Sequence, residues 1–314
     1  MKRLGGVIMA QQFDKETIEK IFFIADEMKR GDYNPEMLKG KIMVTLFYEP
    51  STRTKLSFEF AMLKLGGMVI GTENAREFSS AAKGESLEDS LRVISGYHPD
   101  LIVLRYHKEG GAERAQKFSS VPIINAGDGT GQHPTQALLD LYTIREKFGR
   151  IEKLNIVMVG DLSNGRTVRS LCYFLAKHYP NNHIYFVSPE QTRMKDDIKN
   201  YLEKHNVSYL ESNELNGVIS TADVVYQTRV QKERFGDNPT LFEEVAKASE
   251  KLAITENILK QMKKEAIIMH PLPRVTEISY AVDNDPRAMY FQQAENGLYI
   301  RKALLFLLPH ENGN

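Results

Sequence analysis

Short apolar runs alternate with amphipathic stretches along nearly the whole chain. The runs have the length of buried strands, and apolar side chains between them recur at helical spacing. The pattern predicts strands at 41–47, 68–71, 100–105, 121–129, 153–161, 183–189, 223–227 and 266–273. It predicts helices at 11–30, after Ser51, around Leu87, Leu91 and Ile94, from 132 onward, and at 167–178, 194–204, 241–248 and 293–308. Strands that alternate with helices indicate α/β domains with parallel sheets.

The length of 314 residues is enough for two such domains. We expect a first domain at 1–134 and a second at 135–290, with a C-terminal helix at 291–314 that packs back on the first. Residues 78–84 are small, polar and rich in helix breakers, so we expect a loop there. Ligands of open α/β sheets bind beyond the carboxyl ends of the strands. Because polar and cationic residues follow several predicted strands, we expect the substrate site in a cleft between the two domains.

The stretch 48–60, YEPSTRTKLSFEF, carries the clearest functional signal in the sequence. It places Ser51, Thr52, Arg53 and Thr54 between a predicted strand and the first turn of a helix. Backbone N–H groups lack helical partners there, and the helix dipole is positive at that end. An ordinary N-cap would need only one hydroxyl group and no arginine. The combination therefore predicts a site for a phosphate-like anion.

Two further segments place cations after predicted strands. The loop 160–167 has the spacing of a P-loop, but Arg166 replaces the lysine, and Asp161 inside the loop would repel a triphosphate. Arg166 suits a small anion such as a carboxylate, and a glycine-rich connection with a surface arginine explains the loop equally well. Arg229 and Gln231 would point to one side of an extended chain, although taken alone they also fit a solvated charged loop.

Two histidine segments offer further polar groups. His133 precedes a predicted helix and Gln136 lies one turn along it, so both side chains can donate toward one point. A lone histidine is otherwise most often a structural residue. The segment 270–273, His-Pro-Leu-Pro, lacks two backbone donors and leaves carbonyl groups that suit a substrate N–H. A rigid turn, with or without a cis peptide bond, is the alternative explanation.

Composition narrows the class of function. Lysine and arginine number 41, as do aspartate and glutamate, and a chain without net charge is a poor candidate for nucleic-acid or membrane binding. The one cysteine, Cys172, lies in an apolar helical run and argues for a reducing compartment, so we expect a cytoplasmic location. No apolar run has the length of a signal peptide or a membrane span. No set of residues has metal-ligand spacing, and we expect no cofactor.

Taken together, these motifs resemble the aspartate/ornithine carbamoyltransferase family over almost the whole chain and in the same order. The matching segments are 51–54, 83–85, Arg105, 133–136, 165–167, 229–231 and 270–274. The chain is more similar to the aspartate branch, because the ornithine branch carries a tryptophan-containing loop near Arg229 and a cysteine after the last-strand histidine. This chain has no tryptophan and has Pro271 at the second place. Tyr106-His107 replaces the His-Pro pair of many relatives.

The resemblance implies roles for individual residues. The phosphate of carbamoyl phosphate would be held by Ser51, Thr52, Arg53, Thr54 and Arg105. The carbonyl oxygen would accept from Thr54, Arg105 and His133, and the carbamoyl amine would be oriented by Gln136 and the carbonyl groups of Pro271 and Leu272. The two carboxylates of L-aspartate would be bound by Arg166, Thr167, Arg229 and Gln231. Ser79 and Lys83 would come from the neighbouring subunit of a homotrimer, with Lys83 also reaching the aspartate.

The resemblance also implies the reaction. The carbamoyl group would pass from carbamoyl phosphate to the α-amine of L-aspartate, giving N-carbamoyl-L-aspartate and phosphate in pyrimidine biosynthesis, with no metal or cofactor. The sequence leaves open whether a separate regulatory chain binds. There are two alternatives: a transferase for another amine, and a nucleotide-binding protein that uses residues 160–167.

Overall fold

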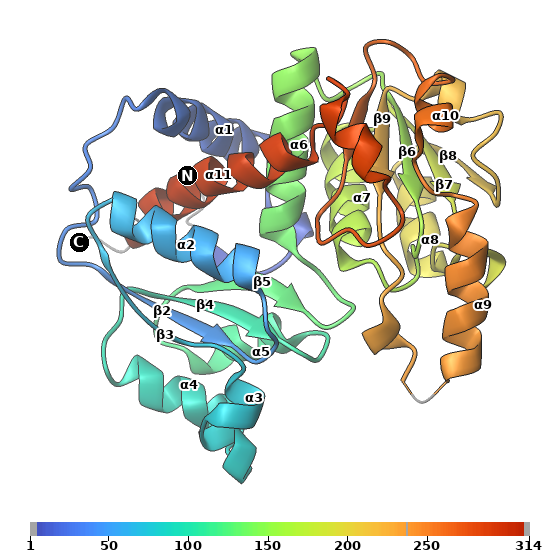
Figure 1. The fold of residues 1–314 in the computed structure, drawn as a ribbon. Helices are drawn as coiled ribbons and strands as arrows, with labels where there is room; N and C mark the ends of the chain where they lie inside the picture. Colours follow the sequence, from blue (N-terminus) through green and yellow to red (C-terminus); the bar gives the residue numbers. More distant parts are fainter. Residues whose placement is uncertain (1–4, 237, 311–314) are drawn as a thin grey trace. The chain divides into compact units, whose positions relative to one another are not determined.

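The computed structural model describes residues 5–236 and 238–310, and the chain forms two compact units (Figure 1). The first unit runs to Leu139 and takes up the chain again at Glu295, whereas the second spans Asp140–Ala294. Each unit holds one five-stranded sheet whose strands all pair in parallel, with helices packed on it. The predicted architecture of two α/β domains with parallel sheets is therefore confirmed.

The sheet of the first unit has the strand order β1-β5-β4-β2-β3. Its strands are β1 Gly6–Val7, β2 Ile42–Phe47, β3 Met68–Thr72, β4 Leu101–Tyr106 and β5 Ile123–Asp128. The central strands β2 and β4 pair from Met43 opposite Leu101 to Phe47 opposite Arg105. Strands β4 and β5 are buried along nearly their whole length, which explains why their sequences are almost continuously apolar.

Helices cover both faces of this sheet, with α2 on one face and α4 on the other (Figure 1). They are α1 Lys15–Arg30, α2 Thr52–Lys64, α3 Ala75–Phe78, α4 Leu87–Ser95 and α5 Gly111–Phe118. Helix α1 begins where the Asp14 carboxylate accepts the N–H of Thr17 at 2.8 Å, and it ends at Gly31 in the left-handed conformation. Its predicted apolar face is buried, which confirms that part of the pattern.

Two long helices belong in part to each unit: α6 Pro134–Phe148 and α11 Tyr290–His310. The C-terminal part of α11 packs within the first unit. The guanidinium group of Arg301 lies 5.1 Å from the ring centre of Phe58 on α2, and Lys302 donates to the hydroxyl group of Tyr33 at 2.6 Å. The last helix thus completes the core that the first 139 residues begin.

The sheet of the second unit has the order β10-β9-β6-β7-β8. Its strands are β6 Asn155–Val159, β7 His183–Val187, β8 Ser208–Ser212, β9 Val224–Gln227 and β10 Ile267–Met269. Its helices are α7 Arg166–His178, α8 Asp196–Lys204, α9 Pro239–Glu250 and α10 Glu256–Leu259. Val159 pairs with Gln227, and Met269 pairs with Tyr226, so β6, β9 and β10 end side by side at one edge. Cys172 on α7 is fully buried, as predicted.

The prediction of a loop at 78–84 was wrong. These residues form the end of α3 and a 3-10 turn, Ser80–Lys83. The hydroxyl group of Ser79 accepts the N–H of Ala81 at 3.2 Å, and Gly84 ends the turn in the left-handed conformation. Polar capping residues therefore stabilise a helical turn where composition alone suggested irregular chain. The pattern also missed β1, α5, β8 and α10, which are short; β8 in addition has few buried positions, so it leaves no apolar run.

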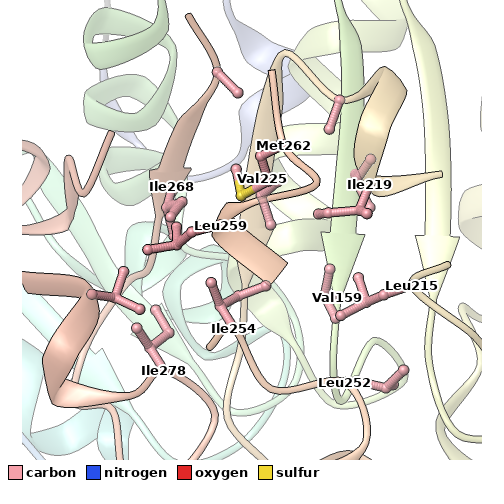
Figure 2. Close-up of a cluster of buried hydrophobic side chains, with 14 of the residues drawn as sticks. Val159, Leu215, Ile219, Val225, Leu252, Ile254, Leu259, Met262, Ile268 and Ile278 are labelled. Carbon is pink, nitrogen blue, oxygen red and sulfur yellow. The ribbon is translucent and has the colours of Figure 1, made fainter. Parts of the chain in front are cut away.

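Part of the core of the second unit lies beside its sheet (Figure 2). Val159, Val225 and Ile268, from three neighbouring strands, are fully buried there. Ile254 and Ile278, from segments that flank α10 in the sequence, cover them and pair as an isolated parallel bridge. No helix within the described residues is both long and apolar enough to cross a membrane.

We expect Ile268→Ala to lower the free energy of unfolding by about 2–5 kcal/mol, because Ile268 is fully buried and its truncation leaves a cavity. The control is Leu210→Ala on β8, whose side chain is 62% exposed and whose loss should cost about 0.5 kcal/mol or less. Urea unfolding of the two variants beside the parent measures the difference. Equal shifts in the two variants would contradict the assigned core.

Candidate active site

The first unit places its polar residues at the topological switch point of its sheet. From β2 the chain continues to β3 on one side, and from β4 it continues to β5 on the other, although β2 and β4 are neighbours. Ligands of open α/β sheets bind beyond the carboxyl ends of such a strand pair. Tyr48 donates its N–H to the carbonyl oxygen of Arg105 at 2.9 Å, so the segment that follows β2 starts beside the end of β4. The structure therefore brings 51–54 and Arg105 to one edge.

The start of α2 differs from an ordinary N-cap. Ser51 occupies the capping position, but its side chain makes no capping hydrogen bond, and its N–H donates to Glu73 at 3.3 Å. Thr54 is buried, whereas Thr52 and Arg53 are exposed. The capping explanation for the hydroxyl group of Ser51 therefore fails in this structure, and the anion-binding explanation is favoured.

Arg105 is held at the strand end from two sides. Its Nη1 donates to the carbonyl oxygen of Ala126 at 3.3 Å, and its Nη2 lies 3.7 Å from the carboxylate of Glu49. Glu49 follows β2 directly and was missed in the sequence, since a single glutamate beside Pro50 gives no distinctive pattern. The guanidinium group is thus oriented by protein acceptors while only part of its surface is covered.

His133 and Gln136 follow β5, the next strand of the same sheet. Tyr106 pairs with Asp128 at the ends of β4 and β5, and the Asp128 carboxylate accepts the N–H of Gln132 at 2.7 Å. His133 is 4% exposed and its carbonyl oxygen accepts the first N–H bonds of α6, from Gln136 at 3.0 Å among others. Both side chains therefore belong to the edge that carries Arg105.

Ser79 and Lys83 follow β3, the outermost strand on their side of the sheet. The hydroxyl group of Ser79 is used within its own turn, because it donates to the carbonyl oxygen of Ala75 at 2.5 Å and accepts from Ala81. Lys83 is exposed and makes no ion pair with any residue among 5–236 and 238–310. The two residues thus lie on an edge segment, separate in sequence and in sheet position from β4 and β5.

The second unit has its own switch point, between β6 and β9. Two loops leave there: 160–165 after β6 and 228–231 after β9. Gly160 has a φ of +112°, and a Cβ on it would lie 2.3 Å from the carbonyl oxygen of Thr228, so only glycine fits. Gln231 donates to the carbonyl oxygen of Asn164 at 3.4 Å and joins the two loops.

Asp161 organises the loop after β6 from inside. Its fully buried carboxylate accepts the N–H of Asn164 at 3.2 Å and the hydroxyl group of Ser163 at 3.1 Å. Burial raises the pKa of Asp161 above its ordinary value, although these hydrogen bonds oppose the shift. A P-loop would bring its phosphates to these N–H groups, which here face a carboxylate. The nucleotide-binding explanation of 160–167 is therefore disfavoured.

Arg166 and Thr167 form the first turn of α7, directly after this loop. The Thr167 side chain lies near the phenol of Tyr226 on β9 and acts to lower the pKa of that phenol, although burial and Asp140 raise it overall. Arg229 already holds a carboxylate in this structure: both of its terminal nitrogens contact Glu233, with Nη1 at 3.2 Å from Oε2. Burial raises the pKa of Glu233, but the hydrogen bond from Arg229, a backbone hydrogen bond and the charges of Arg229 and Arg234 together outweigh it, and the net shift is downward. The guanidinium group thus has the geometry for bidentate carboxylate binding.

The His-Pro-Leu-Pro turn follows β10 at the same edge. Leu272 donates its N–H to Nδ1 of His270 at 2.7 Å, so Nε2 carries the ring proton and faces Oε1 of Glu277 at 2.8 Å. Leu272 has a φ of +52°, and the bond from Leu272 to Pro273 is cis. No N–H of a described residue donates to the carbonyl oxygens of Pro271 and Leu272, so both are available as acceptors. The turn has the cis peptide bond that the sequence left open, and the role of its carbonyl groups toward a substrate N–H stays a prediction.

Glu277 was missed in the sequence, although it holds this turn. It is 7% exposed and also accepts the N–H groups of Val275 and Thr276, each at 3.1 Å. Burial raises the pKa of Glu277, but the hydrogen bond from His270 and the two backbone donors lower it below its ordinary value. Within the described residues, no three His, Cys, Asp or Glu side chains come together in a way that could hold a metal ion.

Two doubly wound units, each with cationic and hydroxyl side chains at its switch point, define a two-domain α/β protein suited to small anionic ligands. Two family models match nearly the whole chain: the carbamoyl-phosphate-binding domain of aspartate/ornithine carbamoyltransferases at residues 6–146, and the Asp/Orn-binding domain at 152–308. The chain belongs to the aspartate/ornithine carbamoyltransferase family, as the motifs indicated.

Individual relatives agree with this assignment. The chain is 58% identical over 309 residues to aspartate carbamoyltransferase 3, chloroplastic, of Pisum sativum, covering 98% of this chain and 78% of the relative. It is 47% identical to the catalytic subunit of the Clostridium acetobutylicum enzyme, with 96% of each chain covered. Among solved structures, Trypanosoma cruzi aspartate transcarbamoylase in complex with carbamoyl phosphate and aspartate matches with a TM-score of 0.91 at 35% identity, over 98% of this chain and 97% of that one.

We expect Glu277→Gln to lower the free energy of unfolding by about 1.5–3 kcal/mol near pH 7, because charge-assisted hydrogen bonds are lost. A carboxyl group whose pKa falls on folding stabilises the protein above its unfolded pKa, and this contribution disappears as pH falls through the folded pKa. The gap between parent and variant should therefore close below about pH 4. Urea unfolding across pH measures it, with Glu265→Gln at an exposed position as control. A gap that is independent of pH would contradict the assignment.

Proposed function

We propose that this chain transfers the carbamoyl group of carbamoyl phosphate to the α-amine of L-aspartate, producing N-carbamoyl-L-aspartate and phosphate for pyrimidine synthesis. The observation that carries the proposal is that the two switch points carry different sets of side chains. One gathers hydroxyl groups and arginines at a helix start, which suits a phosphate, and the other carries arginines with carboxylate-binding geometry. Family membership and the named relatives support the same reaction.

In the first unit, Ser51, Thr52, Arg53, Thr54 and Arg105 bind the phosphate group. Thr54, Arg105 and His133 donate to the carbonyl oxygen, which gains negative charge as the amine attacks. Each donor aimed at such an oxygen lowers the barrier by about 3–4 kcal/mol. Gln136, together with the carbonyl oxygens of Pro271 and Leu272 that the second unit supplies, accepts hydrogen bonds from the carbamoyl NH₂ group and orients it. A C–N bond forms, the C–O bond to phosphate breaks, and the departing phosphate takes the proton of the amine.

In the second unit, Arg166, Thr167, Arg229 and Gln231 bind the two carboxylates of aspartate. The ion pair of Arg229 with the Glu233 carboxylate shows the geometry that one of these carboxylates would adopt, and substrate would take the place of Glu233. Two arginine forks select a dicarboxylate over ornithine, whose side chain ends in a cation. We infer that the other amine-transferring branch of the family is excluded on this ground.

The exposed apolar side chains of the first unit support a homotrimer. Leu56, Phe60 and Leu63 recur at helical spacing on α2, yet all three are exposed, and Met68 and Ile70 are exposed on the edge strand β3. Clustered exposed apolar residues and an uncovered sheet edge are typical of protein interfaces. The Ser80–Lys83 turn follows this edge, so an interface there would carry Ser79 and Lys83 toward the site of a neighbouring subunit.

We also infer a cytoplasmic location, from the single buried cysteine and the balanced charge. The plant relatives are described as chloroplastic, so cell fractionation of the native protein decides between the compartments.

We expect the purified protein to convert carbamoyl phosphate and aspartate to N-carbamoyl-aspartate, and Arg53→Ala to lower kcat/KM by about 10²–10³-fold, since it removes a donor from the phosphate site. Arg53→Lys should be nearly as damaging, because a point charge cannot replace a bidentate fork. Arg229→Ala is the matched variant at the other switch point and should mainly raise KM for aspartate. Steady-state kinetics in which each substrate is varied in turn distinguish a defect in carbamoyl phosphate binding from a defect in aspartate binding. If Arg53→Ala affected mainly aspartate and Arg229→Ala mainly carbamoyl phosphate, the assignment of the two sites would be wrong. A parent protein that is inactive with aspartate would refute the proposed reaction.

The shared site is tested by mixing two inactive proteins, Arg53→Ala and Lys83→Ala. In a cyclic trimer with sites shared in one direction, every mixed ring contains one junction where an intact Arg53 meets an intact Lys83 of the neighbouring chain. Activity should therefore return after subunit exchange. Mixed rings are isolated by charge, using a charged tag on one parent. If they remain as inactive as the two parents, each site lies within one chain and the proposal of a shared site is wrong.

A further inference from the structure

A fully buried carboxylate, that of Asp140 on α6, connects two substrate-binding segments of the second unit. Its Oδ2 accepts the phenol O–H of Tyr226 at 2.7 Å, and its Oδ1 accepts the side-chain amide of Gln293 at 2.7 Å. Tyr226 precedes the 228–231 loop in the sequence. Gln293 forms a hydrogen bond with His270, the first residue of the His-Pro-Leu-Pro turn. A carboxylate at such depth is costly unless it is well hydrogen-bonded, so its position calls for an explanation.

The first arm of the network fixes the turn. Gln293 uses its amide oxygen to accept the N–H of His270 at 2.8 Å and its nitrogen to donate to Asp140. The amide therefore has one permitted orientation, because a flip would place two donors against each other at His270 and two acceptors at Asp140. Pro271 and Pro273 have no N–H, so the turn offers only the N–H groups of His270 and Leu272 for anchoring.

Both of those N–H groups are held by side chains. Gln293 holds the first, and Nδ1 of His270 holds the second at 2.7 Å. The N–H of Leu272 shares a peptide plane with the carbonyl group of Pro271, so its hydrogen bond to Nδ1 of His270 sets the direction of that oxygen. The hydrogen bond from His270 to Gln293 holds the backbone at the start of the turn, from which Pro271 and Leu272 follow.

The second arm reaches the opposite substrate segment. Tyr226 is fully buried in β9 and pairs with Met269 of β10. Burial and the neighbouring Asp140 raise the pKa of the Tyr226 phenol well above its ordinary value, so the phenol stays protonated and keeps donating. Asp140 thus accepts one hydrogen bond from Tyr226 on β9, which leads into the 228–231 loop, and one from Gln293 on α11, which anchors the His-Pro-Leu-Pro turn.

We propose that Asp140 is a positioning residue for carbamoyl transfer: through Gln293 it anchors the start of the turn that presents the Pro271 and Leu272 carbonyl groups, and through Tyr226 it ties this turn to the strand that precedes Arg229. This inference rests on the proposed function for the roles of those residues. Asp140 touches no substrate. Its contribution is the alignment of the nucleophile-binding segment with the acceptors of the carbamoyl amine, and small misalignments of reacting groups are costly.

The test uses four variants of the full-length protein in its native oligomer. Gln293→Met removes the amide at similar length, and Asp140→Leu removes the carboxylate at similar volume; each should lower kcat roughly tenfold to a hundredfold. Asp140→Asn keeps an oxygen for Gln293, while the Tyr226 hydroxyl group can accept from the new NH₂, so it should retain at least ten times the kcat of Asp140→Leu. Tyr226→Phe deletes the other hydrogen bond to the same carboxylate and should mainly raise KM for aspartate.

A second readout separates positioning from stability and from the proposed function. Hydrogen exchange of the peptide that contains His270 and Leu272 should accelerate in Gln293→Met and Asp140→Leu but not in Tyr226→Phe, whether or not the protein is active. The double variant Asp140→Leu/Gln293→Met should be no worse than either single variant, because both break the same arm.

Two outcomes overturn the proposal. The first is that Gln293→Met keeps kcat within twofold of the parent and shows unchanged hydrogen exchange at the turn, while circular dichroism and oligomer size show that the variant is folded. The other is that all four variants lose kcat in proportion to their loss of melting temperature, as a purely structural network would. Failure of the parent protein to carbamoylate aspartate is a separate result, because it refutes the proposed function while the exchange measurement still decides the anchoring of the turn.

Discussion

Each unit depends on one pairing of parallel strands whose onward connections leave in opposite directions. In the first unit β2 pairs with β4, and in the second β6 pairs with β9. The pairing brings together two loops that are far apart in the sequence, such as 160–165 and 228–231, and it leaves a gap between the helices at that point. The polar residues of the candidate site gather there because the sheet topology leaves that place for them.

Buried carboxylates hold these loops in place through hydrogen bonds. Asp161 holds the loop after β6, Glu277 holds the His270 turn, and Asp140 connects that turn with β9. Each accepts several hydrogen bonds, which offsets the cost of burying a charge. The arrangement places carboxylates inside the loops, and arginine side chains on the side where we propose that anionic substrates bind.

A phosphate group and a carboxylate group are bound by different kinds of donor, and in the proposed site each unit supplies one kind. A phosphate is bound by many donors at a helix start, where the backbone itself contributes. A carboxylate is bound by an arginine fork, and the Arg229 fork pairs with the Glu233 carboxylate in this structure. The exposed apolar residues of α2 and β3 belong to neither task, and the proposed subunit interface would give them a function.

The sequence by itself determined the two α/β domains, most of the strands and longer helices, and the family, because these follow from local periodicity and from motifs within short segments. It also identified the arginine and hydroxyl residues at the start of α2. It missed short elements such as β8 and α10, and it mistook 78–84 for a loop, because capping bonds and sheet edges leave no periodic signal. Only the tertiary structure showed Glu49 beside Arg105, Glu277 beneath the His270 turn, and Asp140 between Tyr226 and Gln293. These carboxylates act on residues up to 153 positions away, and a contact across that distance is set by strand order and register, which no local pattern encodes.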